Sequence, residues 1–418
     1  MLNRTLTPEL KEIDAIEFVS PAIHVIEGKT KLFHMAEVPN NTSRLDLYFD
    51  AGTARGERAI AGFVNGMLLS GSERVSATEI QSQIDALGGF YESGISQEKD
   101  VISIYALKEH LLDIFRIIAG ALEELSFTQK EMKEMLNDRR QKFKVNMEKV
   151  SFLAQREFQQ RLFHNSIYGR VSDESDFEKV EREKLIAFFN EHYLHGLYKV
   201  VVVGAIPDNE INEIIALSSK WAKGTSNNYE SSLKNAKESH YLKKDGALQT
   251  AIRLGRILFN KTHEDYLDFL VLNTILGDYF GSRLMSNIRE DKGYTYGIGS
   301  MVAELHETGY FLIATEVGKD VKDAAIEEIK KELVRLQEEP VAEEELELVK
   351  NYMLGQLLKS ADGPYSMTDL FLSVEPHGMD LDFYNNAIDS LHAIKAERIQ
   401  ELAKRYLHWD DFTVVAAG

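Results

Sequence analysis

The stretch LGDYFGSRLMSNIREDKGYTYGIGSMVA, residues 276–303, determines how the rest of the chain is interpreted. After a glycine-containing loop, the hydroxyl of Ser282 is placed to accept from a free amide in the first turn of a short helix. Leu284 and Ile288 lie one helical turn apart and give that helix an apolar face. Gly293 then permits the left-handed turn that ends the helix, and a strand of alternating side chains follows.

Two polar side chains, Arg289 and Tyr296, come to the same end of this helix–turn–strand unit. Arg289 leaves the last helical turn, and Tyr296 lies at the start of the strand. Residue types alone favour an ordinary surface arginine and a half-buried strand tyrosine, by roughly two to one. The alternative is a pair of fixed donors aimed at a carbonyl oxygen, as in oxyanion stabilisation.

The sequence of this unit resembles a known signature. Ser-Arg-Leu at 282–284, followed by Ile-Arg-Glu-x-Lys-Gly-x-x-Tyr at 288–296, is similar to the second-half motif of the pitrilysin/insulinase family of zinc peptidases. The resemblance is strongest to the small two-domain members, which work as pairs of chains. In that family the arginine and tyrosine of the motif serve the zinc site from across a chamber, which implies this role for Arg289 and Tyr296.

The same resemblance implies where the metal would bind in a catalytic chain. There the first helix of the first domain carries His-x-x-Glu-His, whose two imidazoles ligate one Zn²⁺ while the glutamate deprotonates the bound water. In this chain the matching helix, 59–69, places Gly62, Asn65 and Gly66 at those three positions. Glycine has no ligand atom and an asparagine amide is a poor base, so we predict that the zinc site is lost.

Other residues offer little to replace the lost ligands. The family's third ligand would fall near residues 138–142, where Glu134 or Asp138 could be proposed, but one carboxylate without two imidazoles would hold Zn²⁺ poorly. His192 and His195 have metal-ligand spacing, yet a Tyr-Leu-His recurs at the equivalent place in the second half. This favours a structural helix end by about four to one. We therefore expect no cofactor in this chain.

Length and composition are those of an ordinary globular chain. Its 418 residues suffice for two domains, and no apolar run reaches the length of about 18 residues that predicts a membrane span. Cysteine is absent, which excludes disulfides and thiolate metal sites. A net charge of −19 argues against nucleic acid as a partner. The first residues lack the apolar core of a signal peptide, so the expected compartment is the cytoplasm.

The two halves of the chain repeat the same order of elements. His-Tyr-Leu-His at 192–195 precedes KVVVVGA at 199–205, as Arg-Tyr-Leu-His at 405–408 precedes FTVVAA at 412–417. A repeat of this length predicts an α+β protein of two similar domains, each with helices packed on a mostly antiparallel sheet.

The domain limits are expected where the composition changes. Residues 1–222 would form the first domain, with the degenerate zinc-motif helix. The polar stretch 223–237, KGTSNNYESSLKNAK, would be a linker. Residues 238–418 would form the second domain, which carries the Arg/Tyr motif and whose sheet is expected to begin with a strand at 248–257.

Local signals predict several elements of the first half. Residues 25–35 read as a hairpin that turns at a glycine, and residues 44–50 alternate polar and apolar side chains as in a half-buried strand. Capping boxes, Ser-x-x-Glu at 76–79 and Thr-x-x-Glu at 128–131, mark the starts of two helices.

The chain thus keeps one part of the family's catalytic apparatus and lacks the other. We expect the non-catalytic subunit of a heterodimeric zinc endopeptidase, in which a homologous partner chain holds the zinc and Arg289 and Tyr296 act on that site in trans. The substrates would be peptides or unfolded segments, contacted by the loop residues Phe280, Gly281 and Ser282. Alone, the chain is expected to bind no zinc and to cleave nothing.

The main alternative is a catalytically inactive peptide-binding or structural scaffold subunit, in which Arg289 and Tyr296 are packing residues. The two hypotheses differ in whether both side chains face a shared cavity and are free of ion pairs within the chain. A homodimer that hydrolyses peptides without metal is a third reading, which no nucleophile motif supports.

Overall fold

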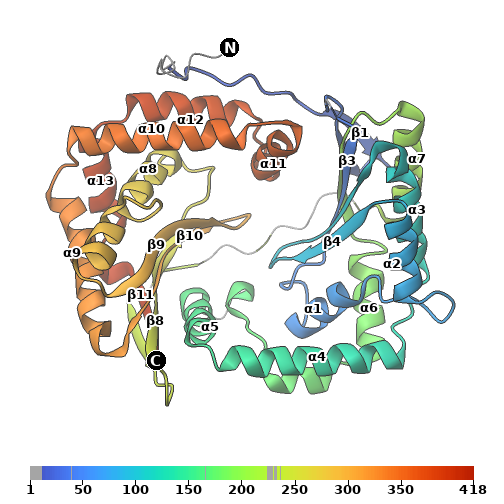
Figure 1. The fold of residues 1–418 in the computed structure, drawn as a ribbon, viewed down its shortest axis with the longest axis horizontal. Helices are drawn as coiled ribbons and strands as arrows, with labels where there is room; N and C mark the ends of the chain where they lie inside the picture. Colours follow the sequence, from blue (N-terminus) through green and yellow to red (C-terminus); the bar gives the residue numbers. More distant parts are fainter. Residues whose placement is uncertain (1–11, 39, 165, 224–228, 230–232, 236) are drawn as a thin grey trace, which may run out of the picture.

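The chain has the expected α+β architecture, with helices packed on two mixed sheets (Figure 1). The computed structural model describes residues 12–38, 40–164, 166–223, 229, 233–235 and 237–418. Most of the predicted linker 223–237 therefore lies outside the described residues.

The first sheet has the strand order β1-β2-β6-β3-β5-β4. Its strands are β1 (Ala22–Ile26), β2 (Thr30–Met35), β3 (Thr42–Phe49), β4 (Phe90–Ile95), β5 (Asp100–Leu107) and β6 (Leu197–Val203). Neighbouring strands are antiparallel except for β2 and β6, which run parallel.

The second sheet has the strand order β7-β11-β8-β10-β9. Its strands are β7 (Glu238–Leu242), β8 (Gln249–Leu258), β9 (Thr295–Glu304), β10 (Gly309–Gly318) and β11 (Thr413–Ala417). Here β7 and β11 form the parallel pair. The order matches β2-β6-β3-β5-β4 strand for strand, which confirms the internal repeat.

The main helices of the first half are α1 (Arg58–Met67), α2 (Ala77–Ala86), α3 (Leu111–Glu123), α4 (Gln129–Met147), α5 (Val150–Phe163), α6 (Arg182–His192) and α7 (Asp208–Ser218). Those of the second half are α8 (Tyr266–Leu276), α9 (Lys322–Glu338), α10 (Glu343–Ser360), α11 (Pro364–Val374), α12 (Asp382–Ala393) and α13 (Ala396–Tyr406).

Several local signals are confirmed. The Ser76 hydroxyl accepts from the Glu79 amide, and the Glu79 carboxylate accepts from the Ser76 amide, so the predicted capping box is complete. At the second predicted box, the Thr128 hydroxyl accepts from the Glu131 amide, but the reciprocal bond from the Thr128 amide to the Glu131 side chain is not made, so this box is only half formed. The first hairpin turns at Gly28, whose φ of 67° is left-handed.

Two expectations about strands are wrong. Strand β3 is buried on both faces instead of one, so that its polar residues Arg44 and Asp46 lie inside the molecule. The second sheet begins with β7, before the strand expected at 248–257. Strand β7 is a short outer strand of mostly polar residues, which lacks the apolar run of a central strand.

Strand β3 is buried twice because a helix from the other half of the chain covers the first sheet. Residues of α11 and α12 form one apolar cluster with β2, β3 and β6, in which the rings of Phe33 and Phe371 lie 5.0 Å apart. Two ion pairs cross the same boundary: Arg44 with Asp369 at 2.8 Å and Lys199 with Glu375 at 2.6 Å.

The second sheet is covered in the reciprocal way, by α5 from the first half (Figure 1). Phe158 and Leu162 of α5 pack with Ile257 of β8 and Val415 of β11. A Cβ at Gly255 would lie 2.8 Å from the Phe158 ring, so this glycine makes room for the helix. The exchange of helices ties the two sheets into one body.

The tips of two hairpins add a third connection between the domains. The carboxylate of Glu98, between β4 and β5, accepts from the backbone amide of His306, between β9 and β10, at 3.0 and 3.1 Å. The Tyr168 hydroxyl donates to the same carboxylate at 2.6 Å.

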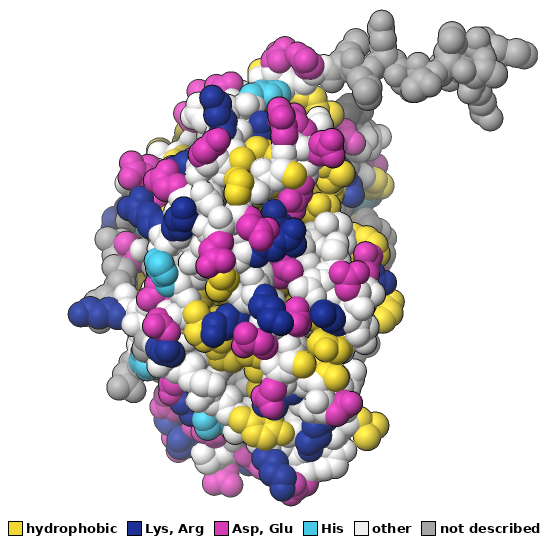
Figure 2. All heavy atoms as spheres, turned by 90° about the vertical axis from the view of Figure 1, so that its left-hand side faces the viewer, with side chains coloured by type: hydrophobic (Ala, Val, Ile, Leu, Met, Phe, Trp, Pro, Cys, Tyr) yellow, Lys and Arg dark blue, Asp and Glu magenta, His cyan; other side chains and the backbone are white. Residues whose placement is uncertain are grey.

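Charge is dispersed over the outer side of the second domain. On its outer side, over α9 and α13, acidic and basic side chains are interspersed and the apolar patches between them are small (Figure 2). Among the described residues, no helix is both long and apolar enough to cross a membrane.

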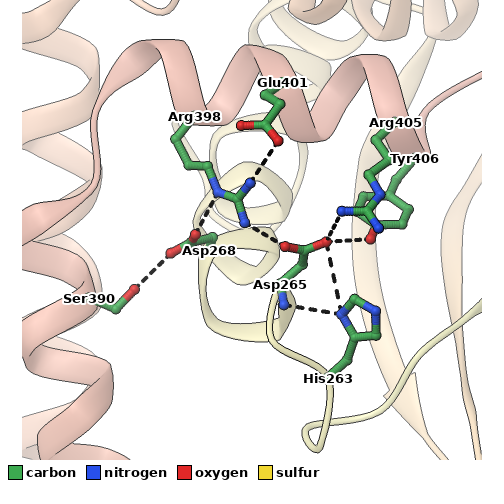
Figure 3. Close-up of polar contacts among 8 residues, drawn as sticks. All are labelled: His263, Asp265, Asp268, Ser390, Arg398, Glu401, Arg405 and Tyr406. Carbon is green, nitrogen blue, oxygen red and sulfur yellow. Dashed lines mark hydrogen bonds and ion pairs between the residues drawn. The ribbon is translucent and has the colours of Figure 1, made fainter.

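A buried carboxylate holds α8 and α13 together (Figure 3). Asp265, 2% exposed, precedes α8 and accepts from Arg398 at 2.5 Å, from Arg405 at 2.8 Å and from the Tyr406 hydroxyl. Burial opposes ionisation, but these donors outweigh it and hold the pKa of Asp265 below its usual value of 3.8.

Replacing Asp265→Asn should lower the free energy of unfolding at pH 7 by roughly 2–4 kcal/mol, because two guanidinium groups lose their shared carboxylate. Since the pKa of Asp265 is lower in the folded state, its contribution is complete above the unfolded pKa and is lost as pH falls through the folded one. Urea denaturation should therefore show the difference at pH 7 and a smaller difference below about pH 4.

The matched control is Asp245→Asn, because Asp245 is an exposed aspartate that pairs only with Lys243 in the described part of the chain. It should leave the urea midpoint unchanged. Equal effects of the two substitutions would contradict the stabilising role of Asp265.

Candidate functional site

The segment that carries Arg289 is a π-helix, Met285–Asp291, where the sequence predicts an ordinary short helix. The Lys292 amide donates to the Asn287 carbonyl five residues earlier, at 3.0 Å. As predicted, Gly293 ends the helix in a left-handed conformation, with a φ of 65°. Such wider turns are rare in proteins, and many of those that do occur lie at functional sites.

Contacts at two points fix this π-helix to its neighbours. Just before it, Arg283 binds Glu345 of α10 in a bidentate pair, with distances of 2.9 and 2.8 Å. Within it, the Asn287 amide donates to Glu332 of α9 at 2.7 Å. Because the segment is held at both points, the backbone under Arg289 is rigidly placed.

Arg289 lies between two aromatic rings. Its guanidinium carbon is 4.7 Å from the centroid of the Phe280 ring and 5.9 Å from that of Tyr296. Both rings project from the surface: Phe280 is 66% exposed and Tyr296 is 94% exposed. Cation–π contacts of this kind hold a guanidinium group without using its N–H groups.

The donors of this pair are available to a ligand. In the part of the chain that the structure describes, neither the Arg289 guanidinium nor the Tyr296 hydroxyl makes a hydrogen bond or an ion pair. Five N–H groups and one O–H group are thus left without a partner among the described residues. This arrangement can bind a carbonyl oxygen or an oxyanion brought by a ligand. Two cavities, of about 220 and 200 Å³, are lined by other residues.

The loop before the π-helix is shaped by close packing. A Cβ at Gly281 would lie 2.8 Å from the Tyr279 ring, so only glycine fits there without a shift. Ser282 begins the helix through its carbonyl, which accepts from the Ser286 amide at 2.9 Å. Its hydroxyl is buried and makes no hydrogen bond with any described residue. The predicted side-chain cap at Ser282 is therefore wrong, and a hydroxyl this buried is not placed to touch a peptide.

On the first domain, the three positions of the degenerate metal motif lie on α1, opposite α4. An arginine of α4 fills the space that ligands would need. The Arg139 guanidinium donates to the Gly62 carbonyl at 2.7 Å. A Cβ at Gly66 would lie 2.6 Å from the same nitrogen, Nη2 of Arg139.

Asn65, at the position of the catalytic glutamate, serves a buried carboxylate instead. Its amide donates to Asp100 at 2.8 Å, and the Tyr193 hydroxyl donates to the same oxygen at 2.5 Å. Burial raises the pKa of Asp100 to about 6, although both hydrogen bonds lower it. Asn65 is thus a structural donor.

The carboxylates proposed as third ligands do not face α1. Asp138 pairs with Lys142 at 2.8 Å and is half exposed, and Glu134 is exposed. Over the described ranges, no three His, Cys, Asp or Glu residues are grouped as a metal site. A cationic guanidinium where a metal would bind is electrostatically unfavourable for Zn²⁺. The residues at this place do not fit a zinc ion.

The two histidines considered as a replacement have structural partners. Nδ1 of His192 contacts the Asp50 carbonyl at 2.8 Å, and Nδ1 of His195 contacts the Asn190 carbonyl at 2.9 Å. Burial lowers the pKa of His192, which keeps the ring neutral. Both rings lie at the end of α6, where they fix the chain before β6.

The domain models of one family match both halves of the chain. An insulinase (peptidase family M16) domain matches residues 34–169, and a peptidase M16 inactive domain matches residues 179–353. The chain belongs to the peptidase M16, or insulinase, family.

Relatives by sequence are named as proteases. The uncharacterized zinc protease YmxG of Bacillus subtilis is 26% identical over 369 residues, which are 85% of this chain and 87% of that protein. An uncharacterized zinc protease of Rickettsia bellii is 26% identical over 309 residues, which are 72% of this chain and 74% of that protein.

Solved structures share the fold at low identity. A peptidase M16 inactive domain from Pseudomonas fluorescens superposes with a TM-score of 0.85 at 21% identity, over 96% of this chain and 98% of that one. A protease from Helicobacter pylori gives 0.81 at 16%, over 96% and 100%. A chain of Complex III2 from Candida albicans gives 0.76 at 14%, over 95% of each chain.

Sequence reasoning placed the lost ligands but missed Arg139. The residue lies inside the run 138–142, where the family resemblance implies a carboxylate ligand. A signal was present: two glycines four residues apart on a buried helix leave a gap, and a long side chain from the facing helix must fill it.

Reintroducing the ligands with Gly62→His, Asn65→Glu and Gly66→His should not create a zinc site. The Arg139 guanidinium occupies the space of the new imidazoles, and a glutamate at position 65 would oppose the Asp100 carboxylate. Adding Arg139→Glu removes the cation and supplies a third carboxylate, so this fourfold variant should take up zinc. Elemental analysis after dialysis gives the stoichiometry.

A fourfold variant with Arg140→Glu is the control, since adjacent helical positions face different directions. Stoichiometric zinc in the threefold variant would show that Arg139 is no barrier to the metal.

Proposed function

We propose that this chain is the non-catalytic subunit of a heterodimeric zinc peptidase that acts on peptides or unfolded segments. One observation carries the proposal. The chain keeps Arg289 and Tyr296 with unused donors, while the residues at Gly62, Asn65 and Gly66 cannot hold or activate a metal-bound water. The oxyanion donors of a zinc peptidase have their catalytic use beside a metal-bound water. Since the residues of this chain do not fit a metal ion, the metal would come from another chain.

In the proposed complex a homologous partner carries His-x-x-Glu-His and the zinc. Tyr296 then donates to the oxyanion of the tetrahedral intermediate, and Arg289 binds a substrate carbonyl. The exposure of Tyr296 supports the assignment of the zinc to one chain and the donors to the other. A hydroxyl that is to reach the site of another chain must project from the surface of this one. No hydrogen bond, ion pair or ring contact between described residues joins Arg289 or Tyr296 to α1.

Extended peptides fit the free edges of the two sheets. Strand β9, which begins one residue before Tyr296, is the outer strand of the second sheet, and β4 is the equivalent outer strand of the first. An outer strand offers unpaired backbone groups to an added strand, and such pairing accepts varied side chains. Substrate selection would then depend mainly on an extended, unfolded conformation.

A second candidate function is that of a structural subunit without a part in catalysis. The observation that favours it is the exposure of Phe280 and Tyr296, two large side chains that project from the surface beside Arg289. Under this hypothesis Arg289, Phe280 and Tyr296 would form a contact surface for another protein.

Substituting Tyr296→Phe distinguishes the two functions in the complex reconstituted with the partner chain. Loss of one oxyanion donor should lower kcat by about 10²-fold or more, while the two chains remain associated. Peptide turnover and size-exclusion chromatography give the two quantities.

The control is Tyr241→Phe, which removes a hydroxyl from β7 at the opposite edge of the same sheet. It should leave turnover unchanged. An unchanged rate with Tyr296→Phe would remove the catalytic role and favour the structural subunit.

A further inference from the structure

The space at the degenerate metal motif is filled by Arg139, and a second arginine, Arg58, lies one helical turn away on the same side of α1. Positions 58, 62 and 66 follow each other at intervals of four along α1 and so lie on one side of the helix. Arg139 reaches the two glycines from α4, and Arg58 stands one turn before the first of them. Its guanidinium donates to the Arg170 carbonyl at 2.6 Å.

Both arginines contact backbone carbonyls. Within the described residues, Arg58 and Arg139 form hydrogen bonds to backbone carbonyls and no ion pair. The adjacent carboxylates are engaged elsewhere, since Glu57 pairs with Lys184 at 3.0 Å and Asp138 pairs with Lys142 at 2.8 Å. Two unpaired guanidinium groups are unexpected in a protein with 67 acidic and 48 basic residues.

The surroundings make both charges costly. Both side chains are half-buried, and burial lowers the pKa of Arg58 and of Arg139, although at Arg139 the charge of Asp138 offsets part of this effect. The positive charge of Arg156 on α5 lowers the pKa of Arg58 further. Arg156 itself forms an ion pair with Asp173. A bound anion would compensate this local excess of positive charge.

Filling the gap between α1 and α4 does not itself require a charge. Apolar side chains of similar volume replace buried ionic groups at no loss of stability in many proteins. Gly66 is exposed, so the guanidinium that it accommodates is within reach of a ligand from solvent. The two glycines of α1 thus leave room for the Arg139 guanidinium, which places an accessible positive charge beside the helix.

We propose that Arg139, assisted by Arg58, forms a binding site for a carboxylate of a peptide, at the place where the metal motif of the family is lost. A guanidinium group presents its N–H donors in a planar fork that matches a carboxylate. Strand β4, the outer strand of the first sheet, packs against α1, so a peptide extended along β4 would run beside the helix that carries Arg58 and the two glycines. The assignment of the ligand as a peptide rests on the proposed function.

The test measures peptide binding to the chain alone, without a partner, by fluorescence anisotropy at fixed ionic strength. One labelled, unstructured peptide is used in three forms: with a free C-terminal carboxylate, with a C-terminal amide, and with that amide and one internal glutamate. The net charge of −19 disfavours the two acidic forms, so a preference for either runs against the overall field. We expect at least one of them to bind about tenfold more tightly than the neutral amide, and the two acidic forms distinguish a terminal from a side-chain carboxylate.

Arg139→Gln should abolish the preference, Arg58→Gln should reduce it, and Arg139→Lys should retain part of it because a charge remains. Arg140→Gln, with the same loss of charge on the same helix, is the control and should change nothing. Circular dichroism establishes that each variant is folded.

The site is refuted if the wild-type chain binds the acidic and neutral forms equally, if none of the three binds, or if Arg139→Gln keeps the preference. These outcomes are independent of the reconstituted activity, so they separate failure of this site from failure of the subunit role. A carboxylate preference in a chain that activates no peptidase would retain the site and contradict the subunit role.

Discussion

The reciprocal exchange of helices between the two halves is the constraint on which the rest of the structure depends. Each sheet has one face covered by its own helices and the other by a helix from the opposite half, α11 on the first sheet and α5 on the second. Neither sheet could be separated from the other half without exposing a buried apolar face. Both outer strands, β4 and β9, are consequently held at fixed places in one body. The rigid unit positions α1 in one domain and the Arg289–Tyr296 pair in the other.

The two domains have diverged in what they present on this shared framework. The second domain holds a guanidinium between two rings and leaves its donors unused. The first domain keeps the helix that carries the metal motif in the peptidase M16 family but fills its ligand positions with two glycines, an asparagine and a guanidinium from α4. Membership in the family is established, whereas the subunit role and the carboxylate site are proposals that follow from these two environments.

Much of the fold could be predicted from the sequence because its signals are local. The repeat, the capping box at Ser76 and the left-handed turns at Gly28 and Gly293 all involve residues close together in the chain. The double burial of β3 could not be predicted, because it depends on Asp369 and its helix, 325 residues away from Arg44. The two glycines of α1 signal that a long side chain fills the gap, but they do not identify Arg139, because its contact with Gly62 spans 77 residues and two helices. The π-helix could not be predicted, because over so few residues its apolar side chains have the same spacing as in an ordinary α-helical turn.

The most direct test of the central claim, that this chain lacks catalytic power and completes another chain's zinc site, is purification of the tagged chain from its source organism. The eluate is assayed for peptidase activity with and without a chelator. We predict a co-purifying homologous chain that bears His-x-x-Glu-His, and activity that the chelator abolishes. A chain that elutes alone and inactive, or one that cleaves peptides by itself in the presence of the chelator, would contradict it.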